Sequence, residues 1–448
     1  MSNPLNMTHG KPLKLLFSFA LPLMFGNVFQ QLYTLVDTAI VGRGVGMDAL
    51  AALGTVDWLN WMLLGIAQGF TQGFSVRMAQ KYGERDMASL QHIIGQSAFL
   101  SALIALICTA LSQAGLPLFL RLLRVPGELK DMATLYTRIV MAGFPAVMFY
   151  NFCASVLRAV GDSKTPLKAM MAAAVTNIVL DCVTVFWLGW GIAGAAAATV
   201  AAQSLSGFLC AARIRKTPEL HFEKAHTKPS GTLCRDLIQI GTPVAAKNVI
   251  ISLGGMTIQT IVNGFVMSFI AGFTATNKLY GLLEIAAISY GYAITTYVGQ
   301  NYGAKKHERI RSGMRSALVL SLVTSILISA VMLLLGRHIT MLFIASENPA
   351  LAAAAGDTAY LYLCFMSVSL PALYLLHAYQ AALQGMGRTV PAMVSGIIEF
   401  ILRVGLALIV GATGFELGIF GAEVSAWFGA AIFLMASYYR CIRKTTPV

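Results

Sequence analysis

Charged residues are scarce in this sequence. Lys, Arg, Asp and Glu make up 11% of the 448 residues, whereas about 25% is usual for a soluble domain. Hydrophobic residues make up 57% and are gathered in long runs. Because a helix needs about 20 mainly apolar residues to cross a bilayer, this composition excludes an ordinary soluble domain and indicates a polytopic membrane protein.

The signatures of common enzymes and cofactor sites are also missing. The sequence has neither a GxxxxGK[ST] phosphate loop nor an HExxH zinc motif. Its seven cysteines are scattered without a CxxC pair, so neither a disulfide framework nor a zinc site is indicated. The N-terminal residues lack a short apolar segment followed by a small-residue cleavage site, so we expect no removable signal peptide. These absences argue against an integral-membrane enzyme, and no cofactor is expected.

Long apolar runs follow one another along the chain and predict twelve transmembrane helices. Most Lys and Arg residues lie at the termini or in the loops after even-numbered runs, so the positive-inside rule places both termini in the cytoplasm. The net charge of +13 is therefore attributed to orientation and to anionic lipid, and nucleic acid is not expected as a partner. The predicted spans are residues 14–40, 49–76, 91–116, 132–157, 166–188, 192–213, 237–267, 272–299, 313–336, 355–382, 391–411 and 416–439.

The two halves of the sequence repeat each other. "LPLMFGNV" (21–28) aligns with "TPVAAKNV" (242–249), which matches Pro22 to Pro243, and "QKYGERD" (80–86) aligns with "QNYGAKK" (300–306). Both pairs are about 220 residues apart, so the pattern predicts an all-α membrane protein with two pseudo-symmetric lobes of six helices. We place the N-lobe at 1–213, a cytoplasmic linker at 214–236 and the C-lobe at 237–448. Parallel repeats of this kind favour alternating access around a midplane site.

Acidic and amide side chains interrupt three of the predicted N-lobe helices. In the first helix, Gln30, Thr34 and Asp37 recur on one face, with Pro22 as a candidate bend. Asn177 and Asp181 share a face of the fifth helix, and a further polar stripe on the sixth helix consists of Ala195, Thr199 and Gln203. Acids at bilayer depth are costly and usually functional, and such oxygen ligands suit a small hard cation or a shared proton. The alternative, in which each acid is separately satisfied by neighbouring hydroxyls and backbone, stays open.

The C-lobe has a different set of polar residues inside its spans. Asn277, Tyr280 and Glu284 share one face of the eighth helix, and Glu284 either meets a cationic substrate or pairs with Lys247 or Lys278. Glu399 precedes Arg403 by four residues in the eleventh helix, the favourable order for an intrahelical ion pair, so we expect them to form a structural pair. His377 is interpreted as a satisfied core histidine.

Several motifs together resemble those of the MATE family of multidrug and toxic compound extrusion transporters, in its bacterial DinF-like and MepA-like branch. The similarity covers essentially the whole chain, including the helix count and the repeat. It rests on "QQLYTLVDTAIVGR" (30–43), "LRAVGDSKTP" (157–166), "NIVLD" (177–181) and "GIAGAAAAT" (191–199).

The resemblance implies a MATE-type fold, also called MOP-type, and an H⁺- or Na⁺-coupled antiporter that exports organic cations and amphipathic toxic compounds. It assigns the N-lobe cation site, including Na⁺ as one occupant, to Asp37, Asn177, Asp181 and Thr199, with the Ala195 carbonyl as a further ligand. It also maps a bend of the first helix to Pro22. We expect a monomer in the bacterial inner membrane.

One departure from the family concerns the C-lobe. NorM-like members place acids in helices 7 and 10, whereas here those spans contain only Asp357, near one end. The alternative function is a flippase of the same superfamily for lipid-linked oligosaccharides or polysaccharides. Such proteins tend to have more helices and a cationic cavity, and the spans of this chain hold more acids than bases in their interior.

Overall fold

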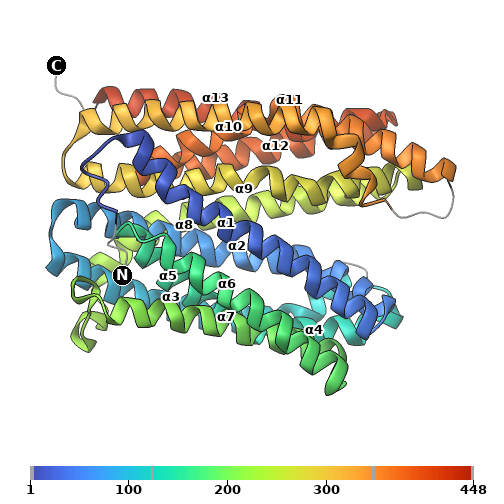
Figure 1. Cartoon of the computed structure of the whole chain (residues 1–448), viewed down its shortest axis with the longest axis horizontal. Helices are drawn as coiled ribbons and strands as arrows, with labels where there is room; N and C mark the ends of the chain where they lie inside the picture. Colours follow the sequence, from blue (N-terminus) through green and yellow to red (C-terminus); the bar gives the residue numbers. More distant parts are fainter. Residues whose placement is uncertain (1–4, 123–124, 345–348, 445–448) are drawn as a thin grey trace. The chain divides into compact units, whose positions relative to one another are not determined.

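The computed structural model describes residues 5–122, 125–344 and 349–444. Within these ranges the chain is helical and contains no strand (Figure 1). The long helices are α1 (Pro12–Gly44), α2 (Met47–Glu84), α3 (Met87–Leu122), α4 (Lys130–Ala142), α5 (Phe144–Ala159), α6 (Lys164–Asp181), α7 (Gly191–Arg215), α8 (Gly231–Val262), α9 (Met267–Gly303), α10 (His307–Met341), α11 (Pro349–Gly385), α12 (Val390–Thr413) and α13 (Ile419–Lys444).

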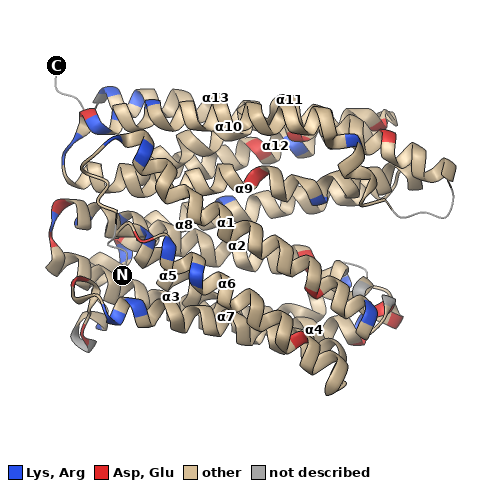
Figure 2. Ribbon diagram, viewed as in Figure 1, with Lys and Arg blue, Asp and Glu red and all other residues tan. Residues whose placement is uncertain are grey.

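Each predicted span corresponds to one of these helices or to a bent pair, which confirms the all-α membrane fold. Among the described residues, nine helices are long and apolar enough to cross a membrane, and the bent pair formed by α4 and α5 makes ten. The remaining two, α2 and α9, have the length but are not among these helices. Charged residues are sparse along the middle of most helices (Figure 2). The chain is therefore a multi-pass membrane protein.

Local breaks follow from particular residues. The fourth span bends by 41° where α4 ends and α5 begins, and Gly143 lies at this break. A Cβ there would fall 2.2 Å from Cγ2 of Val200 on α7, so the close approach requires glycine. The seventh span ends at Val262, earlier than predicted, because the chain turns at residues 263–266 before α9 begins.

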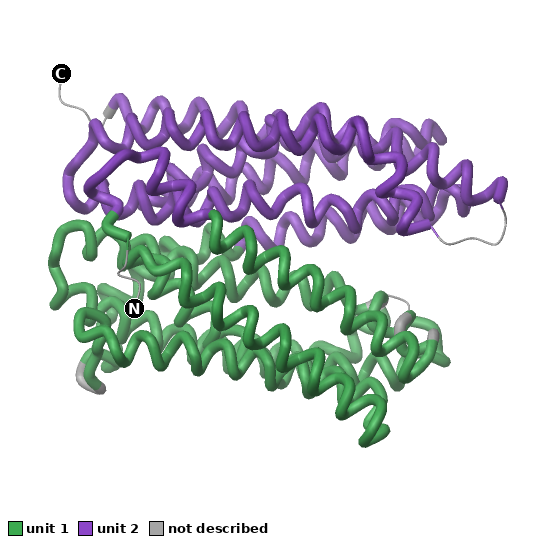
Figure 3. The backbone as a smooth tube through the Cα atoms, in the orientation of Figure 1, with its two compact units in different colours: residues 1–6, 21–245 green, residues 7–20, 246–448 purple. Residues whose placement is uncertain are grey.

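Two compact units divide the chain, and Figure 3 colours them separately. Unit 1 comprises residues 1–6 and 21–245, and unit 2 comprises residues 7–20 and 246–448. These boundaries differ from the predicted lobes, because residues 7–20 group with unit 2 and residues 237–245 with unit 1. The division into six-helix lobes itself stays a prediction.

The predicted linker is short and attached to unit 1. Between α7 and α8 the chain forms two 3-10 turns, η3 (Pro218–Leu220) and η4 (Lys224–Thr227). Gln96 of α3 is fully buried, and its amide donates to the carbonyls of His226 and Lys228 at 2.6 and 2.5 Å. This part of the linker is thus held against the unit rather than free in solution.

Candidate functional site

Helices α1 and α6 run side by side in the same direction within unit 1. A Cβ added at Gly26 of α1 would lie 3.4 Å from Sδ of Met170 on α6, and one at Gly44 would lie 2.4 Å from Cγ1 of Val185, just beyond the end of α6. This register brings Asp37 level with the last turn of α6, where Asp181 lies. The Asp37 and Asp181 carboxyl groups lie close enough to interact electrostatically.

Asp181 and the neighbouring Asn177 are buried, Asp37 is half-buried, and buried polar atoms of all three lack hydrogen-bond partners. Asp181 is 0% exposed and Asn177 is 1% exposed. One oxygen of Asp37, both carboxylate oxygens of Asp181 and both polar atoms of Asn177 have no hydrogen-bond partner. Buried polar groups are nearly always paired, and two carboxylates can bond each other only if one carries a proton. The geometry therefore suits a shared proton or a small cation held by oxygen atoms.

The chain changes its helical winding immediately after Asp181. Residues Cys182–Trp187 form a π-helical turn, η2, a rare feature that often marks functional sites. The Thr184 hydroxyl donates to the Leu180 carbonyl at 2.8 Å. A Cβ at Gly194 of α7 would lie 2.8 Å from Cβ of Thr184. The wider turn thus places a hydroxyl-bearing residue directly against α7.

Ala195 and Thr199 lie on α7, which packs against both α6 and η2. The Thr199 hydroxyl donates to the Ala195 carbonyl at 3.1 Å, and Ala195 is 2% exposed. Since the hydroxyl proton is used within α7, Thr199 could offer a cation only oxygen lone pairs. The structure therefore brings Asp37 and Asp181 together directly, while ligation by Ala195 and Thr199 stays a prediction.

Two tyrosines near the acids were missed by the sequence analysis. The Tyr33 hydroxyl reaches the side chains of Gln30 and Gln203, and Tyr33 lies in the electrostatic field of both acids. Tyr136 of α4 lies in the same field and is 9% exposed. Tyr33 precedes Asp37 by four residues, so the shared helix face could have revealed it. Gln30 and Gln203, predicted as cavity residues, are thus linked to the acid site through Tyr33.

Two other first-helix predictions have different outcomes. Thr34 is exposed, and its hydroxyl donates to the Gln30 carbonyl at 2.9 Å; its role as a cavity residue stays a prediction. Pro22 lies inside α1, which continues through it, and the boundary between the two units falls directly before it, between residues 20 and 21. A functional bend at Pro22 stays a prediction.

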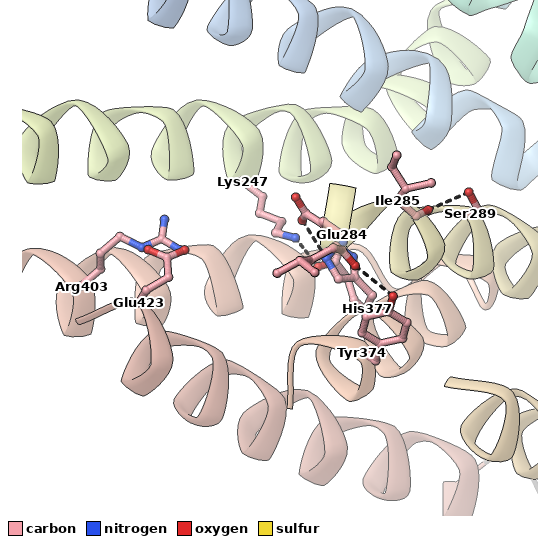
Figure 4. A network of polar contacts seen from close by, with 10 residues as sticks. Lys247, Glu284, Ile285, Ser289, Tyr374, His377, Arg403 and Glu423 are labelled. Atoms are coloured by element: carbon pink, nitrogen blue, oxygen red, sulfur yellow. Dashed lines mark hydrogen bonds and ion pairs between the residues drawn. The ribbon is translucent and has the colours of Figure 1, made fainter. Parts of the chain in front are cut away.

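Unit 2 contains a separate cluster of buried charges, drawn in Figure 4. Oε1 of Glu284 on α9 lies 3.1 Å from Nε2 of His377 on α11. The ammonium group of Lys247 on α8 donates to the side chain of Gln380. Glu284 therefore pairs with His377 rather than with either lysine considered from the sequence, and His377 is a satisfied core histidine as predicted.

The predicted pair of Glu399 and Arg403 is wrong. Arg403 instead binds Glu423 of α13 at 2.6 Å, and both side chains are largely buried (Figure 4). Oε1 of Glu399 is buried and has no hydrogen-bond partner. The reason is the tertiary packing, because α13 packs closely on α12 and brings the Glu423 carboxylate to the Arg403 guanidinium.

The other predicted C-lobe residues lie in α9 and α11. Tyr280 stacks on Trp427 of α13 with ring centroids 5.8 Å apart, while Asn277 is half-buried one turn earlier. Asp357 forms an exposed ion pair with Arg337 at 2.8 Å. Its exposure agrees with the expectation that no buried acid of α11 takes the place seen in NorM-like members.

Comparisons with known proteins agree with this fold. A family model described as MatE matches residues 22–183 and 243–409. The chain is 28% identical over 402 residues to the probable multidrug resistance protein YpnP of Bacillus subtilis, covering 88% of this chain and 87% of that protein. It is 24% identical to the probable multidrug resistance protein NorM of Thermotoga maritima, covering 93% and 88%. The multidrug export protein MepA of Staphylococcus haemolyticus is 22% identical, with 95% and 93% covered.

Solved structures show the same fold. A crystal structure of MATE in complex with MaL6 has a TM-score of 0.91 at 23% identity and covers 99% of both chains. The outward-facing conformation of a multidrug resistance MATE family transporter of the MOP superfamily has a TM-score of 0.92 at 22% identity and covers 100% of both chains. The MatE match spans well over half of the sequence, including the helices that carry the acid site. The chain belongs to the MatE family of transporters, and it is therefore a transporter of small molecules across a membrane rather than an enzyme.

Proposed function

We propose that the protein is an H⁺- or Na⁺-coupled antiporter that exports organic cations and other amphipathic toxic compounds by alternating access. The observation that carries the proposal is the cluster of Asp37, Asn177 and Asp181, in which four oxygen atoms are buried without donors. A proton or Na⁺ entering this cluster supplies the missing partner and neutralises a charge in a dry part of the unit. Binding and release of that cation would then drive the conformational cycle.

The substrate class is supported by the relatives. YpnP and NorM are each named as probable multidrug resistance proteins, and MepA is named as a multidrug export protein. The printed name of a further relative from Shewanella oneidensis, 23% identical over 448 residues, is FAD transporter. We therefore place this chain with the exporters of drug-like cations, and a test should include an anionic dinucleotide as a second substrate.

The driving force is consistent with a bacterial cytoplasmic membrane. Each positive elementary charge that moves inward across the membrane releases about 2.3 kcal/mol of free energy per 100 mV of membrane potential. Placement of both termini in the cytoplasm is supported by the positive-inside distribution of Lys and Arg. We further propose that a single chain carries out the cycle, since the acid cluster is formed by helices of one unit.

Transport into proteoliposomes tests this proposal. Uptake of an ethidium-like cation is measured with a pH gradient and with a Na⁺ gradient imposed separately, and we expect one of the two to drive it. Asp37→Asn and Asp181→Asn should each abolish the driven uptake. Asp131→Asn, which changes an exposed acid at the start of α4, is the matched control and should transport as wild type.

Two outcomes would refute the proposal. Uptake that neither gradient accelerates would exclude cation coupling, and full uptake by both Asp37→Asn and Asp181→Asn would exclude the acid cluster as its site. Movement of a fluorescent lipid-linked oligosaccharide without dye transport would instead support the flippase function.

A further inference from the structure

The first helix of each repeat is divided between the two units. Helix α1 begins in unit 2 and continues in unit 1 after residue 20, and helix α8 begins in unit 1 and continues in unit 2 after residue 245 (Figure 3). Pro22 and Pro243, which the repeat aligns, lie within three residues of these boundaries. The chain therefore crosses between the units in these two equivalent places, and it crosses a third time between residues 6 and 7.

Unit 1 holds the beginning of α8 through side chains at the end of α2. The Arg77 guanidinium donates twice to the Asp236 carboxylate, at 2.7 and 2.8 Å. A Cβ at Gly73 would lie 2.4 Å from Cα of Gly241, so the two backbones touch where neither residue has a side chain. Leu237 is fully buried in the hydrophobic core of this unit.

Unit 2 holds the segment that leads into α1 in the corresponding place, around the loop between α9 and α10. Met7 is fully buried and Thr8 is 8% exposed. Side chains from residues 300–309 make five hydrogen bonds to the backbone of residues 7–10. These bonds join Met7 N to Gln300 Oε1 at 3.0 Å, Asn301 Nδ2 to Met7 O at 3.0 Å, Arg309 to Met7 O at 3.2 Å, Lys306 Nζ to Thr8 O at 3.0 Å and Arg309 to Gly10 O at 3.1 Å.

The residues just before this segment are anchored to unit 1 instead. The Leu5 amide donates to the carbonyl of Gly161, in the turn between α5 and α6, at 3.1 Å. Gly161 has a φ of 94°, and a Cβ there would lie 2.1 Å from the Leu5 carbonyl oxygen. Only glycine permits both this backbone conformation and the close approach of Leu5.

We propose that residues 5–10 form a strap that links the two units and limits how far the Gly161 turn can move from the loop between α9 and α10. The two anchored amides, those of Leu5 and Met7, are two residues apart. Since an extended chain spans at most about 3.3–3.6 Å per residue, the strap allows the anchors to be roughly 7 Å apart. Rocking of the two halves that opens the side of the membrane facing these loops must therefore release one anchor. The strap acts as a latch on that opening.

Lengthening the strap without removing an anchor tests this role. Three glycines inserted between Asn6 and Met7 add about 10 Å of reach while every anchoring residue is retained. The same three glycines inserted directly before Leu5 lie outside the anchored stretch and form the matched control. Spin labels at Lys164, three residues after Gly161, and at Ser312 near the start of α10, both exposed, report the separation of the Gly161 turn from the loop between α9 and α10 by double electron–electron resonance. Clickable unnatural amino acids carry the labels, so the native cysteines can stay.

In lipid nanodiscs, we expect the insertion after Asn6 to raise the ratio of long to short label separations roughly fivefold over wild type, the factor that corresponds to the loss of about 1 kcal/mol. The control insertion should leave the distribution unchanged. Equal distributions for the two insertions, with unchanged melting temperatures, would overturn the proposal. The inference rests on alternating access in the proposed function, but the measurement needs neither a coupling ion nor a drug. Failure of ion-driven transport would therefore leave its result interpretable.

Discussion

Asp181→Asn is the most informative change at the acid cluster. The substitution keeps the shape of the side chain but removes one of two facing carboxylates and introduces an amide that can donate to Asp37. In the wild-type protein both Asp181 oxygens are buried without a donor. The variant should therefore need no cation to satisfy the site, and it should be at least as stable as wild type in ion-free buffer.

The size of the effect follows from the unpartnered atoms. Four oxygens, on Asp37, Asn177 and Asp181, lack donors, and each such buried group costs about 1–3 kcal/mol. An ion that binds only the folded state adds about 2.7 kcal/mol to the free energy of unfolding when its concentration is 100 times its Kd. This is less than the summed cost of the four unpartnered oxygens, so we use it to calculate the expected change in melting temperature. We expect the coupling ion to raise the melting temperature of wild type by about 3–6 °C and that of Asp181→Asn by less than about 1 °C.

Thermal unfolding of the detergent-solubilised protein measures this difference. Na⁺ is titrated at fixed pH against a choline background, and pH is then varied without Na⁺. Asp131→Asn serves again as the control and should show the wild-type response. The reasoning would be refuted if Asp181→Asn kept the full ion-dependent rise in melting temperature. It would also be refuted if the variant melted well below wild type in ion-free buffer, because that result would mean that the acid has a purely structural role.

Three further predictions concern stability. Glu423→Leu should lower the free energy of unfolding by about 3–5 kcal/mol because it leaves Arg403 buried without its partner, and adding Arg403→Met should recover most of that loss. Chemical denaturation measures both variants, and a double variant that is less stable than Glu423→Leu alone would contradict this expectation. Gly73→Ala should cost about 1–3 kcal/mol, because its Cβ meets the backbone of α8, whereas Gly54→Ala, with open space around it, should melt as wild type. Hydrogen bonds from the serine three residues later hold the pKa of Asp86, outside the membrane, below its usual value. The ionised Asp86 carboxylate should therefore stabilise the wild type fully at pH 7, and this contribution should be lost as the pH falls through the lowered pKa. The difference in melting temperature between wild type and Asp86→Ala should accordingly shrink between pH 7 and pH 3.

Much of the fold could be predicted because the membrane-spanning helices are visible in the sequence as long apolar runs. The twelve apolar runs, the repeat and the register of the acidic residues are properties of local sequence, and backbone groups in lipid have few alternatives to a helix. The same local reasoning singled out Asp37 and Asp181 as acids at bilayer depth, whereas their assignment to one site came from the resemblance to the MATE motifs. Local reasoning failed for Glu399 and Arg403, because an i, i+4 spacing says which side chains can meet along a helix but not which neighbour a second helix supplies.

The sequence by itself thus determined the membrane class, the helices and the acids that lie where acids are costly. Only the tertiary structure decided that Glu284 pairs with His377 and Arg403 with Glu423, and that a π-helical turn follows Asp181. It also decided that the first helix of each repeat begins in the opposite unit. The physical reason is that hydropathy records how much each residue gains from leaving water, whereas partners for buried charges and the path of the chain between units depend on contacts between residues far apart in sequence.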